Sequence, residues 1–201
     1  EPTTVTAPTP TPEPTTVTGT KEKDGIEKAE SIDDITAKSE ISRFQLNERI
    51  LIGDQDVKIL IQGTNKKDKI TGTSDGEILS GGSGKDVLKG GKGADAFFFR
   101  DPEGFGKKEA DKIKDFDSNE GDSIFLDKSI FNLGTKIKLK IVYSKKDRNK
   151  ASKSINDLIY LETKGLLYFN DDGNIKGWGD GGLLAKLKGN PELSISDFTI
   201  I

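Results

Sequence analysis

A nine-residue unit occurs four times without interruption over residues 63–98, and this period constrains the fold more than any other feature of the sequence. Each unit follows the pattern G-[GT]-x-x-x-[DE]-x-U-x, in which U is apolar. The units at residues 81–89 and 90–98 hold its fullest form, Gly-Gly-x-Gly-x-Asp. Repetition at one short period predicts a solenoid, in which each unit is one structural element that stacks on others.

Each unit divides into a turn and a short strand. The first six residues are expected to form the turn, because Gly adopts positive φ angles without strain. The last three residues form a strand, and the apolar residue at position eight points inward. The four residues at this position, which are expected to stack into one thin apolar seam, are Ile70, Leu79, Leu88 and Phe97.

A thin seam needs a further source of stability, because ordering many glycines costs conformational entropy. Calcium suits this role, since it takes roughly six to eight oxygen ligands, which turn carbonyls and the position-six acids could supply. Two units are expected to make one coil, which pairs Asp68 with Asp86 and Glu77 with Asp95. Without a cation the stacked carboxylates repel one another, so calcium is predicted to cross-link the turns and to neutralise them.

The nonapeptide resembles the calcium-binding repeat of the RTX exoproteins, and the resemblance continues toward the C-terminus. The segments that carry it are GGKGADAFFF (90–99), DKIKDFD (111–117), GDSIFL (121–126), LIYLETKGLLYFNDDGN (158–174) and LLAKLKGNPELSISDFTII (183–201). They are similar to the C-terminal domain of these proteins, including that of the serralysin-type metalloproteases. The resemblance implies an all-β fold, with a parallel β-roll of nonapeptide repeats and a β-rich C-terminal cap. It also implies a type I secretion signal at the extreme C-terminus, where this chain reads DFTII.

The expected calcium ligands are the turn residues at fixed positions of the repeats, together with two later acids that only the resemblance assigns. The full set is Gly63, Asn65, Asp68, Gly72, Ser74, Gly76, Glu77, Gly81, Ser83, Asp86, Gly90, Lys92, Asp95, Asp111 and Asp115. Glu77 departs from the Asp pattern, and Thr64 and Thr73 replace the second Gly of their units, which leaves the affinity of those turns open. The turn at residues 170–174 is either a further ion site or an ordinary turn, since Asn170 stands where the family pattern has an acid.

The remaining segments differ in composition. Residues 1–20, EPTTVTAPTPTPEPTTVTGT, predict a disordered, semi-stiff Pro/Thr linker. Residues 21–62 are expected to be a flank with a short helix near residues 31–46 and strand structure over residues 49–62. The β-roll is expected over residues 63–99 and the cap with the secretion signal over residues 100–201.

Three features of the cap segment have simple structural interpretations. Residues 135–143, TKIKLKIVY, alternate Lys with apolar residues, as an edge or half-exposed strand does. Residues 145–150, KKDRNK, predict a solvated basic loop. Tyr160 and Trp178 are expected to anchor the core of the cap.

Composition excludes several function classes. The chain has no Cys and no His, so disulfides, thiolate metal sites and imidazole-based catalysis are excluded within it, and no enzyme is expected. The net charge is −3, with 31 basic and 34 acidic residues, which does not favour nucleic acid as a partner. No apolar run approaches the roughly 20 residues of a membrane span.

The function expected from these observations is a calcium-binding folding module of a larger exported protein. It would remain unfolded where free calcium is scarce, leave through a type I exporter and fold outside the cell as a monomer. One alternative is an extracellular adhesin or surface-layer anchoring domain that grips a cell surface or a glycan. Another is an enzyme with a carboxylate-only site, such as a glycosidase pair.

Overall fold

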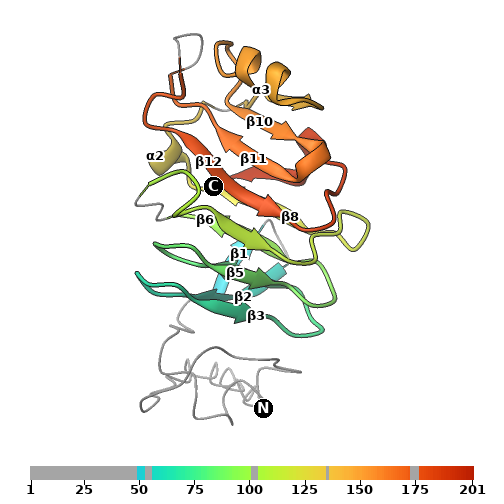
Figure 1. Ribbon diagram of the computed structural model, residues 1–201. Helices are drawn as coiled ribbons and strands as arrows, with labels where there is room; N and C mark the ends of the chain where they lie inside the picture. The colour runs from blue at the N-terminus through green and yellow to red at the C-terminus, as the bar shows by residue number, and fades with distance from the viewer. Residues whose placement is uncertain (1–48, 53–55, 101–103, 135, 173–176) are drawn as a thin grey trace, which may run out of the picture.

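Short strands dominate the computed structural model, which describes residues 49–52, 56–100, 104–134, 136–172 and 177–201, with side chains from Leu60 onward (Figure 1). The fold is β-rich with few helices, and many of its strands are parallel, as the repeat pattern predicts. The predicted linker at residues 1–20 and the predicted helix near residues 31–46 lie outside the described residues.

The strands of the first part of the chain are separated by glycine-rich turns. They are β1 (Arg49–Ile52), β2 (Asp56–Gln62), β3 (Lys69–Thr71), β4 (Glu77–Ser80), β5 (Val87–Lys89), β6 (Ala96–Phe99), β7 (Asp111–Ile113) and β8 (Ser123–Leu126). Strands β3 to β6 each begin at the position-six acid of a repeat or directly after it. The nine-residue unit therefore divides into turn and strand at the acid.

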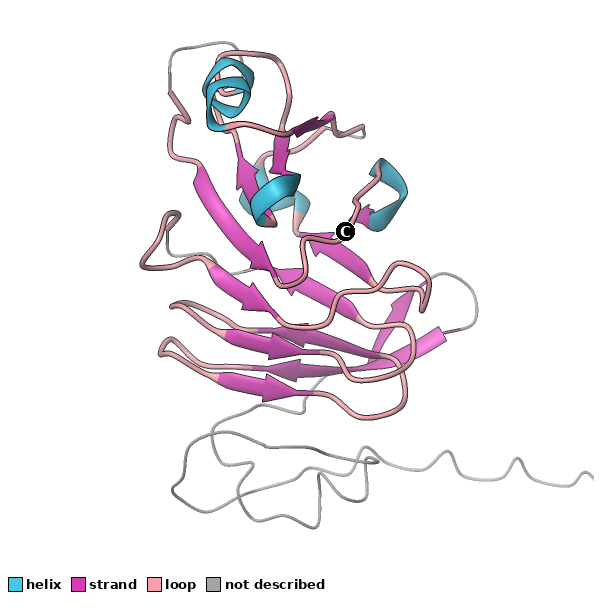
Figure 2. Cartoon of the chain, turned by 45° about the vertical axis from the view of Figure 1, so that its right-hand side comes forward, coloured by secondary structure: helices cyan, strands magenta, loops and turns pink. Residues whose placement is uncertain are grey.

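From β2 to β8, consecutive strands alternate between two sheets, so this part of the chain winds as a flattened coil (Figure 2). One sheet has the order β1-β2-β4-β6-β8-β13, and the other begins β3-β5-β7. The repeat strands within each sheet are parallel, with Ile70 opposite Leu88 and Leu79 opposite Phe97. Two nonapeptides thus make one turn of the coil, and each turn stacks on the one two units along.

The position-eight residues form the predicted apolar seam. Ile70, Leu79 and Phe97 are fully buried and Leu88 is 1% exposed, and all four belong to one core cluster. The cluster runs on into the second part of the chain, so the seam is continuous with a larger core. This continuity supplies apolar packing that the repeats alone do not have.

A second apolar layer lies on the other face of the first sheet, where the sequence analysis expected none. It consists of Leu60, Ile78, Ala96, Phe98 and Phe125, all buried. Successive strand residues point to opposite faces, and β4 and β6 carry apolar residues at both kinds of position. Phe98 and Phe125 meet edge to face with ring centroids 6.4 Å apart.

The C-terminal elements cover the end of the coil. They are α2 (Lys128–Phe131), β9 (Leu139–Val142), α3 (Lys145–Ala151), β10 (Leu158–Leu161), η2 (Glu162–Lys164), β11 (Leu166–Phe169), β12 (Gly182–Leu187), η3 (Ile195–Asp197) and β13 (Phe198–Ile200). Strand β12 pairs in parallel with β7, and β13 pairs in parallel with β8. Beyond β12 the second sheet continues through β11 and β10 to β9, which is its last strand.

The predicted features of the cap have mixed outcomes. The prediction of a loop for the segment KKDRNK is wrong, because the segment forms α3. Ser144 caps this helix by accepting a hydrogen bond from the backbone amide of Asp147. Strand β9 is the predicted edge strand. Tyr160 is fully buried in the main core, whereas Trp178 is half-buried and stacks on Tyr168 at 4.9 Å. Among the described residues, no helix combines the length and apolar character that crossing a bilayer requires.

Candidate metal-binding turns

The position-six acids on one side of the coil form a ladder of hydrogen bonds. The backbone amide of Asp68 donates to Oδ1 of Asp86 at 2.8 Å, and the amide of Asp86 donates to Oδ1 of Asp111 at 2.8 Å. All three side chains are buried. The coil therefore places one carboxylate beside the turn that precedes it in the stack, and Asp111 continues the series beyond the repeats.

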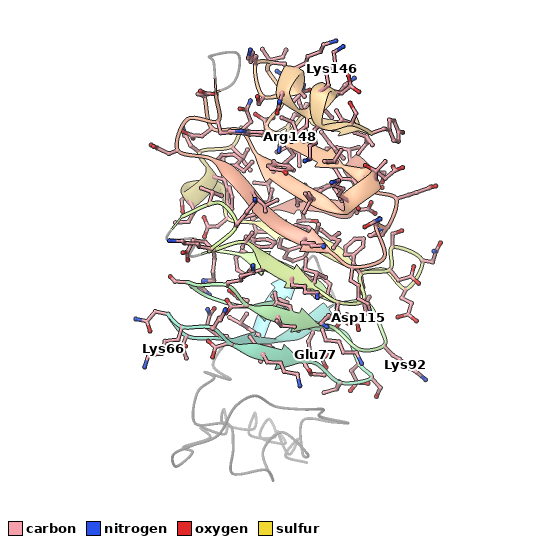
Figure 3. The ribbon with its side chains drawn as sticks, in the orientation of Figure 1. Lys66, Glu77, Lys92, Asp115, Lys146 and Arg148 are labelled. Carbon is pink, nitrogen blue, oxygen red and sulfur yellow. The ribbon has the colours of Figure 1, made fainter. Side chains whose placement is uncertain are left out.

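The other side of the coil has the same ladder. The amide of Glu77 donates to Oδ1 of Asp95 at 2.9 Å, and the amide of Asp95 donates to Oδ1 of Asp122 at 2.9 Å. Asp115, the other predicted later acid, accepts from the amides of Gly90 and Gly91 at 3.0 and 3.1 Å. In Figure 3, Asp115 and Glu77 lie toward the same side of the molecule.

Asp122 is a further acid of the ladder that the sequence analysis missed. It holds two turns together, because its Oδ2 also accepts from the amide of Asp117 at 2.9 Å. A local signal was present: each ladder acid is followed two residues later by a buried apolar residue, and Asp122 precedes Ile124 in this way. The longer spacings after Asp95 hid the signal, because they break the nine-residue period.

The second glycine of the later repeats allows the turns to stack closely. Gly82 and Gly91 have φ angles of 83° and 116°, in the region that favours glycine. A methyl group on Gly82 would overlap the carbonyl oxygen of Thr64, and one on Gly91 would overlap that of Thr73. Backbone carbonyl oxygens of one turn therefore lie directly against the next turn.

Asp86 provides the clearest test of whether these turns suit a cation. Its Oδ1 accepts the Asp68 amide, while its Oδ2 is buried and has no hydrogen-bond partner. This second oxygen lies against Gly81, the first residue of the same turn. A buried carboxylate oxygen without a hydrogen-bond donor is a ligand that a hard divalent cation such as calcium would bind.

Burial disfavours the charged form of the ladder acids. Desolvation, together with the charge of neighbouring carboxylates, raises the pKa of Asp86 to about 7 and that of Asp95 to about 8. Burial also raises the pKa values of Glu77, Asp111 and Asp122. Since ionisation of these acids opposes folding, a bound cation would stabilise the folded state by compensating their charge.

In the first two repeats, a threonine of the same turn donates hydrogen bonds to the position-six acid. Oδ2 of Asp68 accepts from the amide and the hydroxyl of Thr64 at 2.8 and 2.7 Å. Glu77 accepts from the amide of Thr73 at 3.0 Å and also from its hydroxyl. In the third and fourth repeats the corresponding residue is Gly, which has no hydroxyl. The threonine hydroxyls thus occupy carboxylate oxygens that a cation would otherwise bind.

A small cavity lies where the third turn faces the loop before β7. Its volume is about 20 Å³, enough for one water-sized particle, and its lining includes Gly81, Gly82, Glu109 and Asp111. Glu109 is a second acid that the sequence analysis missed, since it precedes β7 outside any repeat. Its charge raises the pKa values of both Asp86 and Asp111.

The other predicted ligands have distinct positions. The side chains of Asn65, Ser74 and Lys92 are exposed, so only their backbone carbonyls could serve a site within the stack. Ser83 is buried, and the remaining predicted residues are turn glycines: Gly63, Gly72, Gly76, Gly81 and Gly90. Within the described residues no three acidic side chains converge on one point, so a cation would take most of its oxygens from the backbone.

The first residue of the turn at residues 170–174, Asn170, has a structural role. The Asn170 amide donates to the carbonyls of Ser154 and Asn156 at 3.0 and 2.9 Å. This contact holds the segment after α3 against the end of β11. Residues 173–176 of the same turn lie outside the described residues.

Comparison with known protein families agrees with this geometry. Residues 61–100 match the model of the RTX calcium-binding nonapeptide repeat, in four copies. Neither the curated proteins nor the solved structures gave a match to the chain. The nonapeptide segment of this chain is therefore an array of RTX calcium-binding repeats.

Proposed function

We propose that the stacked turns bind calcium ions and that this binding completes the folding of a β-roll over residues 63–126. The observation that carries the proposal is the buried carboxylate of Asp86. One of its oxygens accepts a hydrogen bond from the Asp68 amide, and the other has no hydrogen-bond donor. Calcium would provide the missing partner and bridge successive turns through carbonyl and carboxylate oxygens. Binding free energy would then contribute directly to folding.

The proposed role is binding and folding rather than catalysis. The ladder acids that the structure describes accept backbone amides, and this use of their oxygens suits structural cross-linking. The absence of His and Cys from the chain supports the same conclusion.

The module is further proposed to fold outside the cell after export by a type I exporter. Strand β13 pairs with β8, the last strand of the coil. A chain whose coil has not formed therefore lacks the strand on which its C-terminal segment packs. In calcium-poor surroundings this segment would stay accessible to the exporter, and calcium outside would then fix it in the sheet.

Hydrogen exchange with and without calcium tests the proposal. Calcium should protect peptides from β3 to β8, and also the β13 peptide, because its partner strand then becomes ordered. Magnesium at the same concentration is the control, since it demands a smaller octahedral site and retains its waters. Equal protection of these peptides in calcium and in chelator would contradict the proposal.

A further inference from the structure

The end of the molecule opposite the repeats carries a concentrated positive charge. Residues 136–153 include seven lysines and Arg148 but one acid, Asp147, although the whole chain has a net charge of −3. All seven lysines are exposed. Figure 3 shows Lys146 at this end and Lys66 and Lys92 at the repeat turns at the other end.

Few acids accompany this charge: Asp147 lies on α3, and Asp157 accepts a hydrogen bond from the backbone amide of Lys138 at 2.7 Å. The carboxylate of Asp147 accepts the hydroxyl of Ser144 at 2.6 Å as part of the helix cap. In the part of the chain that the structure describes, no ion pair joins these lysines to an acid. Closely spaced cations without counter-charges repel one another, so an anionic partner would relieve that repulsion.

The helix that carries part of this charge is fixed in place. The guanidinium of Arg148 lies over the ring of Tyr168 at 5.2 Å and donates to its hydroxyl at 3.1 Å. The Tyr168 ring in turn stacks on Trp178. This stack orients α3 against the sheet, so the backbone that carries the lysines does not have to be ordered on binding.

A pocket opens between β9 and α3, in the middle of the charged surface. Its volume is about 440 Å³, within the range of roughly 300–1,000 Å³ typical of small-ligand sites. Its lining includes Lys140 from β9, Lys150 and Asp147 from α3, and the buried side chains of Val142 and Ala151. Tyr143, with 63% of its surface exposed, also lines the pocket.

We propose that this surface, made by β9, α3 and the pocket between them, binds an acidic polysaccharide. The lysines would pair with sulfate or carboxylate groups along the polymer, and Tyr143 would pack against a sugar ring. Single-stranded nucleic acid fits less well, because it needs aromatic platforms for successive bases and the described part of this surface exposes one aromatic ring. The concave pocket suits a polymer segment better than the flat face of a lipid bilayer. This binding is independent of the proposed calcium role.

Calorimetric titration with dextran sulfate and with unmodified dextran, in saturating calcium, tests the proposal. Dextran sulfate should bind with an affinity that falls as sodium chloride is raised, and dextran should not bind. The double variant Lys140→Ala/Lys150→Ala should bind about tenfold more weakly or worse, since charge-assisted contacts are lost. The matched control is Lys69→Ala/Lys89→Ala, which removes two exposed lysines from β3 and β5 at the far end of the same sheet.

Further variants separate the contribution of the lysine charges from that of the Tyr143 ring. Lys140→Arg/Lys150→Arg should keep most of the affinity, and Tyr143→Ala should weaken binding without a change in charge. Equal binding of dextran, or an equal loss in the Lys69/Lys89 control, would overturn the proposed site. Tighter binding of oligothymidylate or of phosphatidylglycerol vesicles through Lys140 and Lys150 would overturn the proposed partner class.

Discussion

The amide of Asp68 and the carboxylate of Asp86 are joined across eighteen positions of sequence by a hydrogen bond of 2.8 Å. The same bond recurs between Glu77 and Asp95 at the same separation. Each acid thus supports the turn below it through one oxygen. What its second oxygen binds differs from repeat to repeat.

Replacing Asp86 by Ala should weaken calcium-induced folding more than replacing Glu77 by Ala. The second oxygen of Asp86 has no donor, whereas Glu77 is already bound by the amide and hydroxyl of Thr73. For calcium, ligand charge is a main determinant of affinity. Calorimetric titration and the calcium midpoint of folding measure both effects. Equal shifts, or a larger shift for Glu77→Ala, would show that the unpaired oxygen of Asp86 does not determine calcium binding.

Replacing Thr73 by Val should destabilise the protein more in chelator than in calcium. The variant keeps the shape of the side chain but removes the hydroxyl, which donates to the buried carboxylate of Glu77 and accepts from the amide of Asp75 at 3.0 Å. The cost should be about 1–3 kcal/mol without calcium and smaller when an ion can bind that carboxylate. Urea denaturation in the two conditions measures it, with Thr199→Val in β13 as the control. A cost that is the same in both conditions would show that the hydroxyl and the ion do not compete.

Replacing Gly82 by Ala should lower the melting temperature clearly, even in saturating calcium. Its φ is 83°, and a methyl group there would overlap the Thr64 carbonyl of the neighbouring turn. The cost should exceed about 1 kcal/mol, because strain and overlap add together. Gly134→Ala is the matched control, since a methyl group on Gly134 would meet nothing within 4 Å. Similar melting temperatures for the two variants would contradict the close stacking of the turns.

Asp127 should stabilise the start of α2 in a pH-dependent way. Its carboxylate accepts from the hydroxyl and amide of Ser129 at 2.6 and 2.8 Å, and these bonds hold the pKa of Asp127 below its usual value. A depressed pKa contributes stability above the pKa of the unfolded chain, and this contribution disappears as pH falls through the folded-state pKa. Urea denaturation of Asp127→Ala should therefore show a loss of about 1 kcal/mol at neutral pH that shrinks in acid. A loss that does not depend on pH would contradict this role, and Asp127→Asn should retain most of the capping.

The repeats could be predicted from the sequence because their period is strict. The period alone locates the seam of Ile70, Leu79, Leu88 and Phe97 and the stacking of turns two units apart. It fails where spacing changes, as with Asp122, whose role depends on a turn of different length.

Features that depend on a single side chain also could not be predicted from the sequence. The segment KKDRNK forms a helix because Ser144 caps it, and pattern analysis gave this serine no weight. The hydroxyls of Thr64 and Thr73 donate to the acids of their own turns, a contact that the repeat pattern does not predict. The second apolar layer around Phe98 depends on outward positions that the repeat pattern leaves unspecified.

The most direct test of the central claim is a comparison of the folded chain in calcium and in excess chelator by far-ultraviolet circular dichroism and thermal melting. We expect calcium to produce the β-sheet signal of the coil and a cooperative melt, and chelator to remove both from the repeat region. Sodium chloride at high concentration should not replace calcium, because a monovalent ion lacks the charge to bridge two turns. A spectrum and a melting curve that are unchanged in excess chelator would contradict the proposal that calcium binding completes this fold.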